Sequence, residues 1–148
     1  MAQKRIPIAR PLFGPEELRA VQLPLESGHV IQGPFVEEFE RRFAAYVGAD
    51  EAVAASSCTT ALHLIVAALG VSPGDEVIVP AFTWISTANV IEHLGGTPVF
   101  CDVDLATYNV EAEQIAPLLT ERTVGVVAVH LFGLSADLDP ILELAADA

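Results

Sequence analysis

Hydrophobic positions near the start of the chain recur at the spacing of an α-helix. Phe35, Phe39 and Phe43 repeat every four residues, which places them on one face of a predicted helix. An earlier helix is predicted to begin at Pro15, because proline favours the first helical turn and two glutamates follow it. The two helices are expected to form a helical entry segment over residues 1–50.

The pattern changes after residue 50, where short apolar runs alternate with longer helical stretches. The apolar runs predict strands at 52–55, 76–79, 97–101 and 124–129. The intervening stretches predict helices at 60–69, 84–94 and 112–119, with a last helix beginning near 136 or 137. Runs that are apolar throughout are typical of strands covered on both faces. The alternation therefore predicts an α/β fold with a mostly parallel sheet over residues 51–148.

Small and hydroxyl-bearing residues lie where the first apolar run leads into a helix. Ser57, Cys58 and Thr59 would lie at the start of that helix, where backbone N–H groups are unsatisfied. Such a turn suits an anion such as a phosphate group. The alternative is ordinary N-capping by Ser or Thr, which needs no ligand.

Three further candidates follow later strands. Trp84, the only tryptophan, could stack on an aromatic cofactor, or it could make ordinary packing contacts in the core or at an interface. His130 could face a ligand or simply satisfy a loop carbonyl. Asp102 and Asp104 could form a carboxylate pair or metal site, but turn capping after a strand is the simpler interpretation. Because parallel strands end at one edge, these segments outline a single ligand crevice.

Charge and composition exclude several classes of function. The chain has 20 acidic and 7 basic residues, a net charge of -13, which disfavours nucleic-acid binding. No apolar run is long enough to cross a membrane. Cys58, Cys101 and the four histidines lack metal-ligand spacing, so no metal site is expected and the thiols are expected to be reduced. Together these features predict a cytoplasmic protein.

In their order and spacing, these segments resemble the DegT/DnrJ/EryC1/StrS family of sugar aminotransferases, which depend on pyridoxal phosphate (PLP). The matching segments are 28–34, 39–40, 46–48, 57–64, 74–80, 83–88, 97–104, 129–133 and 137–141. The resemblance covers the chain from about residue 11 onward. It implies an incomplete three-layer α/β/α large domain of a fold-type I PLP-dependent transferase, in which the sheet is mostly parallel.

The resemblance also implies a cofactor site. Ser57, Cys58 and Thr59 would hold the PLP phosphate, although many relatives carry Asn and Gly at the first two positions. Trp84 would stack on the pyridine ring. A second set of residues would lie on the substrate side of the pocket: Gly28, Ile31, Gln32 and His130.

The implied reaction transfers an amino group from glutamate or glutamine to a nucleotide-linked keto-sugar, in a homodimer. The family uses a lysine that binds the cofactor covalently, whereas the only lysine here, Lys4, lies outside every matching motif. The chain is therefore expected to be the amino-terminal part of the PLP-binding domain, without a catalytic residue and inactive alone. Two alternatives stay open. One is a sugar dehydratase of the same family, in which histidine replaces the lysine, and the other is a non-catalytic α/β interaction module.

Overall fold

The computed structural model describes residue 7 and residues 10–147. The chain divides into two compact units, Met1–Ala54 and Ala55–Ala148. The expected fold class is confirmed, since the described residues contain α-helices and a small parallel sheet. Among these residues, no helix combines the length and apolarity needed to cross a lipid bilayer.

The first unit contains two helices whose ends are marked by glycine and proline. They are α1 (Pro15–Ser27) and α2 (Pro34–Val47). Each begins with proline directly after a glycine, and each ends before a glycine in the left-handed conformation. Gly28 and Gly48 have φ angles of 73° and 75°, values that residues with a Cβ atom rarely adopt. The prediction of two entry helices is confirmed.

The predicted strand at 52–55 is wrong, because no strand forms there. A strand needs a neighbouring strand for its backbone hydrogen bonds, and the described part of the first unit offers none. The N–H of Ala54 donates instead to Oε1 of Glu40 in α2, at 2.7 Å. A side chain therefore takes the hydrogen bond that a strand neighbour would have accepted.

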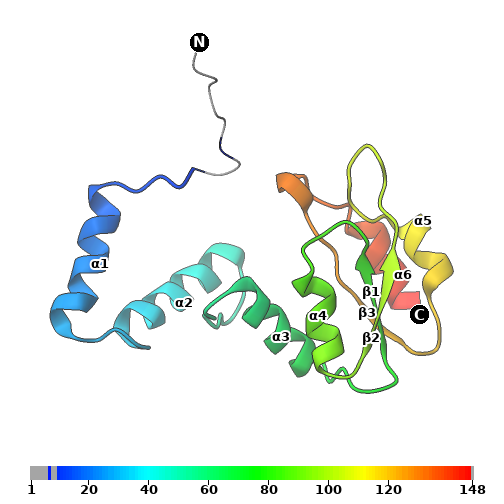
Figure 1. Cartoon of the computed structure of the whole chain (residues 1–148), viewed down its shortest axis with the longest axis horizontal. Helices are drawn as coiled ribbons and strands as arrows, with labels where there is room; N and C mark the ends of the chain where they lie inside the picture. Colours follow the sequence, from blue (N-terminus) through cyan, green and yellow to red (C-terminus); the bar gives the residue numbers. More distant parts are fainter. Residues whose placement is uncertain (1–6, 8–9, 148) are drawn as a thin grey trace, which may run out of the picture. The chain divides into compact units, whose positions relative to one another are not determined.

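The second unit is built on three parallel strands (Figure 1). They are β1 (Glu76–Pro80), β2 (Thr97–Cys101) and β3 (Thr123–Val126), in the order β2-β1-β3. Every residue of the central strand β1 is buried, whereas β2 and β3 are only partly covered. Only the central strand therefore has the two-sided cover that its apolar sequence predicted.

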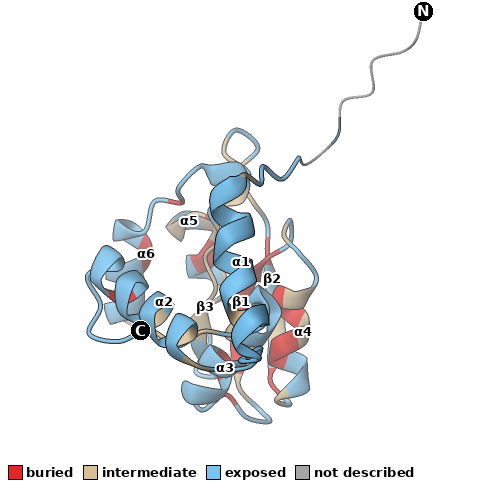
Figure 2. Cartoon of the chain, turned by 90° about the vertical axis from the view of Figure 1, so that its left-hand side faces the viewer, coloured by how far each residue is buried: buried red, intermediate tan, exposed pale blue. Residues whose placement is uncertain are grey.

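Helices cover both faces of this sheet. They are α3 (Cys58–Ala68), α4 (Ser86–His93), α5 (Ala112–Ile115) and α6 (Asp139–Asp147). Val77 and Val79 of β1 pack in one core cluster with residues of α3 and α4. Ile78 points the other way and packs in a second cluster with residues of α5 and α6. Figure 2 shows buried residues in α4, and the central strand β1 is buried throughout. Because alternate residues of β1 point to opposite faces of the sheet, the strand packs against helices on both sides. The unit therefore has three layers: helices, sheet and helices.

Several predicted boundaries differ from the structure. Helix α4 begins at Ser86 rather than at residue 84, and β3 ends at Val126 rather than at 129. The helix expected over 112–119 is interrupted, because a 3-10 turn at Ala116–Leu118 follows α5 and contains a proline without an N–H donor. The last helix begins at Asp139, three or two residues later than expected, with a proline in its first turn.

A buried carboxylate joins the first and third strands. Glu76, at the start of β1, is 8% exposed and accepts a 2.6 Å hydrogen bond from the Thr120 hydroxyl. Arg122 donates to the same carboxylate through Nε, at 2.9 Å, and through Nη2. The hydrogen bond from Thr120 and then that from Arg122 hold the pKa of Glu76 below its ordinary value. These bonds tie the segment before β3 to the central strand.

Candidate functional site

The first turn of α3 leaves backbone donors free. Ser57 is the N-cap in an extended conformation, and its hydroxyl oxygen accepts the N–H of Thr60 at 3.1 Å. The Ser57 carbonyl accepts the N–H of Ala61 at 3.0 Å. Within the described residues, the N–H groups of Cys58 and Thr59 have no hydrogen-bond acceptor, and both residues are exposed. The helix therefore begins with two solvent-facing donors.

This turn suits the phosphate group of a cofactor. Two free N–H groups at the positive end of an eleven-residue helix favour an anion, and the Thr59 hydroxyl can add a third donor. The N-cap predicted as the simpler alternative is present, because Ser57 caps the helix. Capping uses the N–H of Thr60 only, so it does not compete with an anion for the other two donors.

Trp84 lies in the turn between β1 and α4 with a side chain that is 77% exposed. Its carbonyl accepts the N–H of Thr87 at 3.0 Å, which anchors the backbone of the turn. Among the described aromatic pairs, none includes the indole ring. Within the second unit the ring does not pack in the core, so a ligand and an interface both stay open as its partner.

An aromatic cluster that the sequence analysis missed lies beside this turn. The ring centroid of Phe82 is 5.7 Å from that of Tyr108 and 6.5 Å from that of Phe132. The three residues follow β1, β2 and β3 respectively, so their rings meet at the carboxyl edge of the sheet. One available signal was that each ring lies a few residues after a strand, but that spacing alone does not indicate contact.

His130 is exposed beyond β3 and makes a hydrogen bond within its own loop. Its Nδ1 accepts the N–H of Ala136 at 3.0 Å. The ring therefore satisfies a loop amide, and not the loop carbonyl that the sequence suggested as the alternative to a ligand. Because an accepting nitrogen carries no proton, Nε2 is the protonated nitrogen of the neutral ring.

Asn109 was also missed by the sequence analysis. Its side chain is buried and joins two loops: Oδ1 accepts the N–H of Leu131 at 3.0 Å, and Nδ2 donates to the Leu134 carbonyl at 3.0 Å. An asparagine in a predicted turn usually indicates a local hydrogen bond, so nothing in the sequence pointed to a contact 22 and 25 residues away.

Asp102 and Asp104 cap the turn after β2, as the simpler interpretation predicted. Oδ1 of Asp104 accepts the N–H groups of Ala106 and Thr107 at 2.9 and 2.8 Å, while Asp102 accepts the N–H of Val103. The hydrogen bonds from Thr107 and then Ala106 lower the pKa of Asp104. In the part of the chain that the structure describes, no three His, Cys, Asp or Glu side chains gather into a metal site.

Both cysteines are free thiols in the structure. Cys58 is exposed in the first turn of α3, and Cys101 is buried at the end of β2. Burial and then the charge of Asp102 raise the pKa of the Cys101 thiol. A raised pKa keeps this thiol protonated and unreactive at neutral pH.

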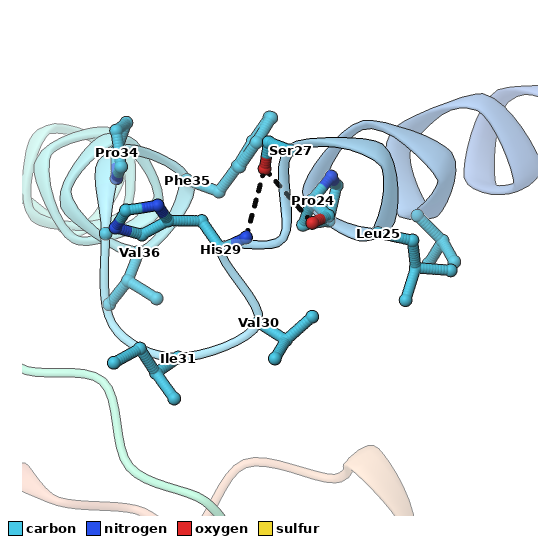
Figure 3. A pocket seen from close by; sticks show the side chains of 11 residues that line it. Pro24, Leu25, Ser27, His29, Val30, Ile31, Pro34, Phe35 and Val36 are labelled. Carbon is cyan, nitrogen blue, oxygen red and sulfur yellow. Dashed lines mark hydrogen bonds between the residues drawn. The ribbon is translucent and has the colours of Figure 1, made fainter.

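The first unit contains a separate apolar cavity of about 610 Å³ between α1, α2 and the loop that joins them. Ile31 lines the cavity together with His29 and Phe35, as Figure 3 shows. The Ser27 hydroxyl donates to the Pro24 carbonyl at 3.0 Å and accepts the His29 N–H at 3.2 Å. Of the other substrate-side candidates in this loop, Gly28 ends α1, and neither it nor Gln32 lines the cavity.

Comparison with known sequences shows the family. The profile of the DegT/DnrJ/EryC1/StrS aminotransferase family matches residues 11–148. The chain belongs to this family. It is 49% identical to the spore coat polysaccharide biosynthesis protein SpsC of Bacillus subtilis, over 98% of this chain and 38% of that protein. It is 42% identical to the UDP-4-amino-4-deoxy-L-arabinose–oxoglutarate aminotransferase of Shewanella sediminis, over 97% of this chain and 37% of that protein.

Solved structures of the family share the fold. The PLP form of the putative sugar aminotransferase Spr1654 from Streptococcus pneumoniae superposes with a TM-score of 0.89 at 37% identity, over 94% of this chain and 36% of that one. A 3-amino-5-hydroxybenzoic acid synthase superposes with a TM-score of 0.87 at 42% identity, over 94% and 37%. The chain thus spans less than two fifths of the length of these relatives.

Proposed function

We propose that the protein to which this chain belongs is a PLP-dependent aminotransferase that transfers an amino group from glutamate or glutamine to a nucleotide-linked keto-sugar. The observation that carries the proposal is the ordered family match over residues 11–148. Residues 1–148 would supply the amino-terminal part of the PLP-binding domain, with 1–50 as its helical entry segment.

The geometry of α3 supports PLP as the cofactor. The N–H groups of Cys58 and Thr59, with the hydroxyls of Ser57 and Thr59 beside them, would bind its phosphate group. The exposed ring of Trp84 would cover one face of the pyridine ring and exclude water from it. When bound, PLP withdraws electrons from the carbon at which the amino group is exchanged.

The names of the relatives support the substrate class. One relative is named for a UDP-linked amino sugar and for oxoglutarate, the keto acid that glutamate becomes when it gives up its amino group. Another structural relative is named for 3-amino-5-hydroxybenzoic acid, which is not a sugar. Family membership alone therefore leaves open which molecule accepts the amino group. Gly28, Ile31, Gln32 and His130 are proposed to lie on the substrate side. The homodimer and the cytoplasmic location stay predictions.

The test is a matched pair of variants in the whole gene product. Thr59→Val keeps the shape of the side chain but removes the hydroxyl, and we expect PLP to bind about ten- to a hundredfold more weakly, the range for one hydrogen bond to a charged group. Ser56→Ala is the control, because the Ser56 hydroxyl lies 3.3 Å from that of Thr60 in the same turn. Binding is measured by equilibrium dialysis, and we expect the control to bind PLP like the wild type.

The reaction is tested with a UDP-keto-sugar, glutamate and PLP, with oxoglutarate measured as product. Oxoglutarate and an amino sugar in equal amounts support the proposal. A deoxygenated keto-sugar in place of the amino sugar, with ammonia released as glutamate becomes oxoglutarate, would identify the dehydratase branch. No PLP binding would favour the interaction module. The 148-residue chain alone is expected to give no turnover, because its only lysine, Lys4, lies outside every family motif.

A further inference from the structure

Two residues other than glycine have left-handed backbone conformations in the described chain, and both contribute to the aromatic cluster. Tyr108 has a φ angle of 58° and Phe132 one of 55°. Residues with a Cβ atom avoid this region because of steric crowding. Both rings contact Phe82 from opposite loops. Such conformations persist only where surrounding contacts hold them in place.

Asn109 provides those contacts for both turns. It directly follows Tyr108, and its side chain reaches the backbone on either side of Phe132. The N–H of Leu131 donates to Oδ1 and Nδ2 donates to the carbonyl of Leu134, each at 3.0 Å. The side chain of Asn109 therefore closes the turn at Phe132, while its backbone belongs to the turn at Tyr108.

The position demands an amide side chain. Asn109 is 3% exposed, so water does not compete for its hydrogen bonds. The side chain must accept one hydrogen bond and donate another. The amide of asparagine has both an acceptor oxygen and a donor nitrogen. Its own N–H donates to the Thr107 hydroxyl at 3.2 Å, so the backbone at this residue is held as well.

The loop that Asn109 holds also determines which ring nitrogen of His130 accepts a hydrogen bond and which can donate one. The N–H of Ala136 donates to Nδ1 of the ring, and these two residues bracket the two backbone groups that Asn109 binds. With Nδ1 occupied as an acceptor, the neutral ring carries its proton on Nε2. The exposed ring then has one N–H to donate and no free acceptor.

We propose that Asn109 is a positioning residue for the carboxyl edge of the sheet. It fixes the loop 130–136, so that Tyr108 and Phe132 stay packed against Phe82 and Nδ1 of His130 stays the acceptor of the Ala136 N–H. His130 would then donate a hydrogen bond to an oxygen atom of a ligand, such as a phosphate, hydroxyl or carbonyl oxygen. This inference rests on contacts within the second unit and does not depend on the proposed reaction.

The test compares Asn109→Asp with the wild type in the whole gene product. Aspartate keeps the size and the acceptor for Leu131 but loses the donor to the Leu134 carbonyl. Hydrogen exchange measured by mass spectrometry is expected to be about ten- to a hundredfold faster in the peptide covering 130–138. Ser135→Ala is the control: its exposed hydroxyl donates to the Ala136 carbonyl at 3.2 Å, and its loss is expected to leave exchange nearly unchanged.

The ¹⁵N resonances of His130 give a second readout, because they report which ring nitrogen carries the proton. Greater mobility of the loop alone does not predict that result. In ¹⁵N-histidine-labelled wild type, with His130 assigned by its absence in His130→Gln, Nδ1 is expected at the unprotonated resonance position and Nε2 at the protonated one. In Asn109→Asp both resonances are expected to move toward the average of a free imidazole. A protonated Nδ1 in the wild type would overturn the proposal even if the variant failed to fold. Unchanged exchange and resonances in a folded Asn109→Asp would overturn it as well.

Discussion

The two units of the chain bury their apolar residues to different extents. In the first unit, the described helices bury only Ala44, while Ile31 and Tyr46 are 80% and 89% exposed. In the second, every residue of β1 is buried and Ile78 is completely inaccessible. Helical periodicity is enough to predict that a helix forms. Burial of its apolar face also requires another layer of structure packed against it. The stability of the chain should be concentrated in the second unit.

The largest expected effect comes from emptying the core of the second unit. Ile78→Ala removes a fully buried side chain from β1 and is expected to lower the free energy of unfolding by about 3–4 kcal/mol. Leu18→Ala in α1 is the matched change, since Leu18 is 71% exposed, and about 0.5 kcal/mol or less is expected. Urea unfolding followed by circular dichroism measures both. Equal losses would contradict the comparison between the units.

A smaller difference is expected at two glycines with similar backbone angles. Gly95 in the second unit has a φ angle of 86°, and a Cβ added there would lie 2.7 Å from Cγ of Pro73. Gly48 in the first unit has a φ angle of 75° and open space around it. Gly48→Ala is expected to cost about 1 kcal/mol from backbone strain alone, and Gly95→Ala about 2–3 kcal/mol, because the clash adds to the strain. Thermal unfolding of both variants tests the order, and a larger loss for Gly48→Ala would contradict it.

The smallest effect concerns two carboxylates with lowered pKa values. The pKa of Glu76 is lowered by Thr120 and Arg122, so its contribution to stability is fully present above the ordinary carboxyl pKa of roughly 4.3 and is lost as the pH falls through the lowered value. Glu76→Gln should therefore be less stable than the wild type at pH 7, and the difference should shrink in acid. Denaturant unfolding from pH 7 to pH 3 measures it.

The matched control in the first unit is Glu38→Gln. The pKa of Glu38 is lowered by a hydrogen bond from Arg41, but this pair is exposed on α2, where water and salt screen it. Its effect at pH 7 should be smaller than that of Glu76→Gln and should disappear at high salt. A difference for Glu76→Gln that does not vary with pH would show that the carboxylate charge contributes nothing.

Much of the fold could be predicted because its signals are local. Pro15 begins a helix, as its fixed backbone angle and missing N–H favour, and the apolar run at β1 is buried as its composition predicted. The capping role of Asp104 also followed from the sequence, since its partners lie two and three residues away.

The candidate site was only partly predictable. The turn at Ser57 could be recognised because a helix start lacks acceptors for its first N–H groups whatever surrounds it. The exposure of Trp84 and the contacts of Asn109 could not, since they depend on which distant segments pack against these residues. His130 was identified as a candidate, but its role as an acceptor for Ala136 appeared only with the shape of its loop.

By itself, the sequence determined that two helices precede residue 50, that β1 is a buried strand, and that residues 11–148 carry the pattern of the aminotransferase family. Only the tertiary structure decided that residues 52–55 form no strand and that Asn109 joins two left-handed turns. The reason is physical: helix hydrogen bonds and caps join residues within one turn, so the local sequence specifies them. Strand pairing and loop contacts join residues far apart in the chain, and they exist only where folding brings both partners together.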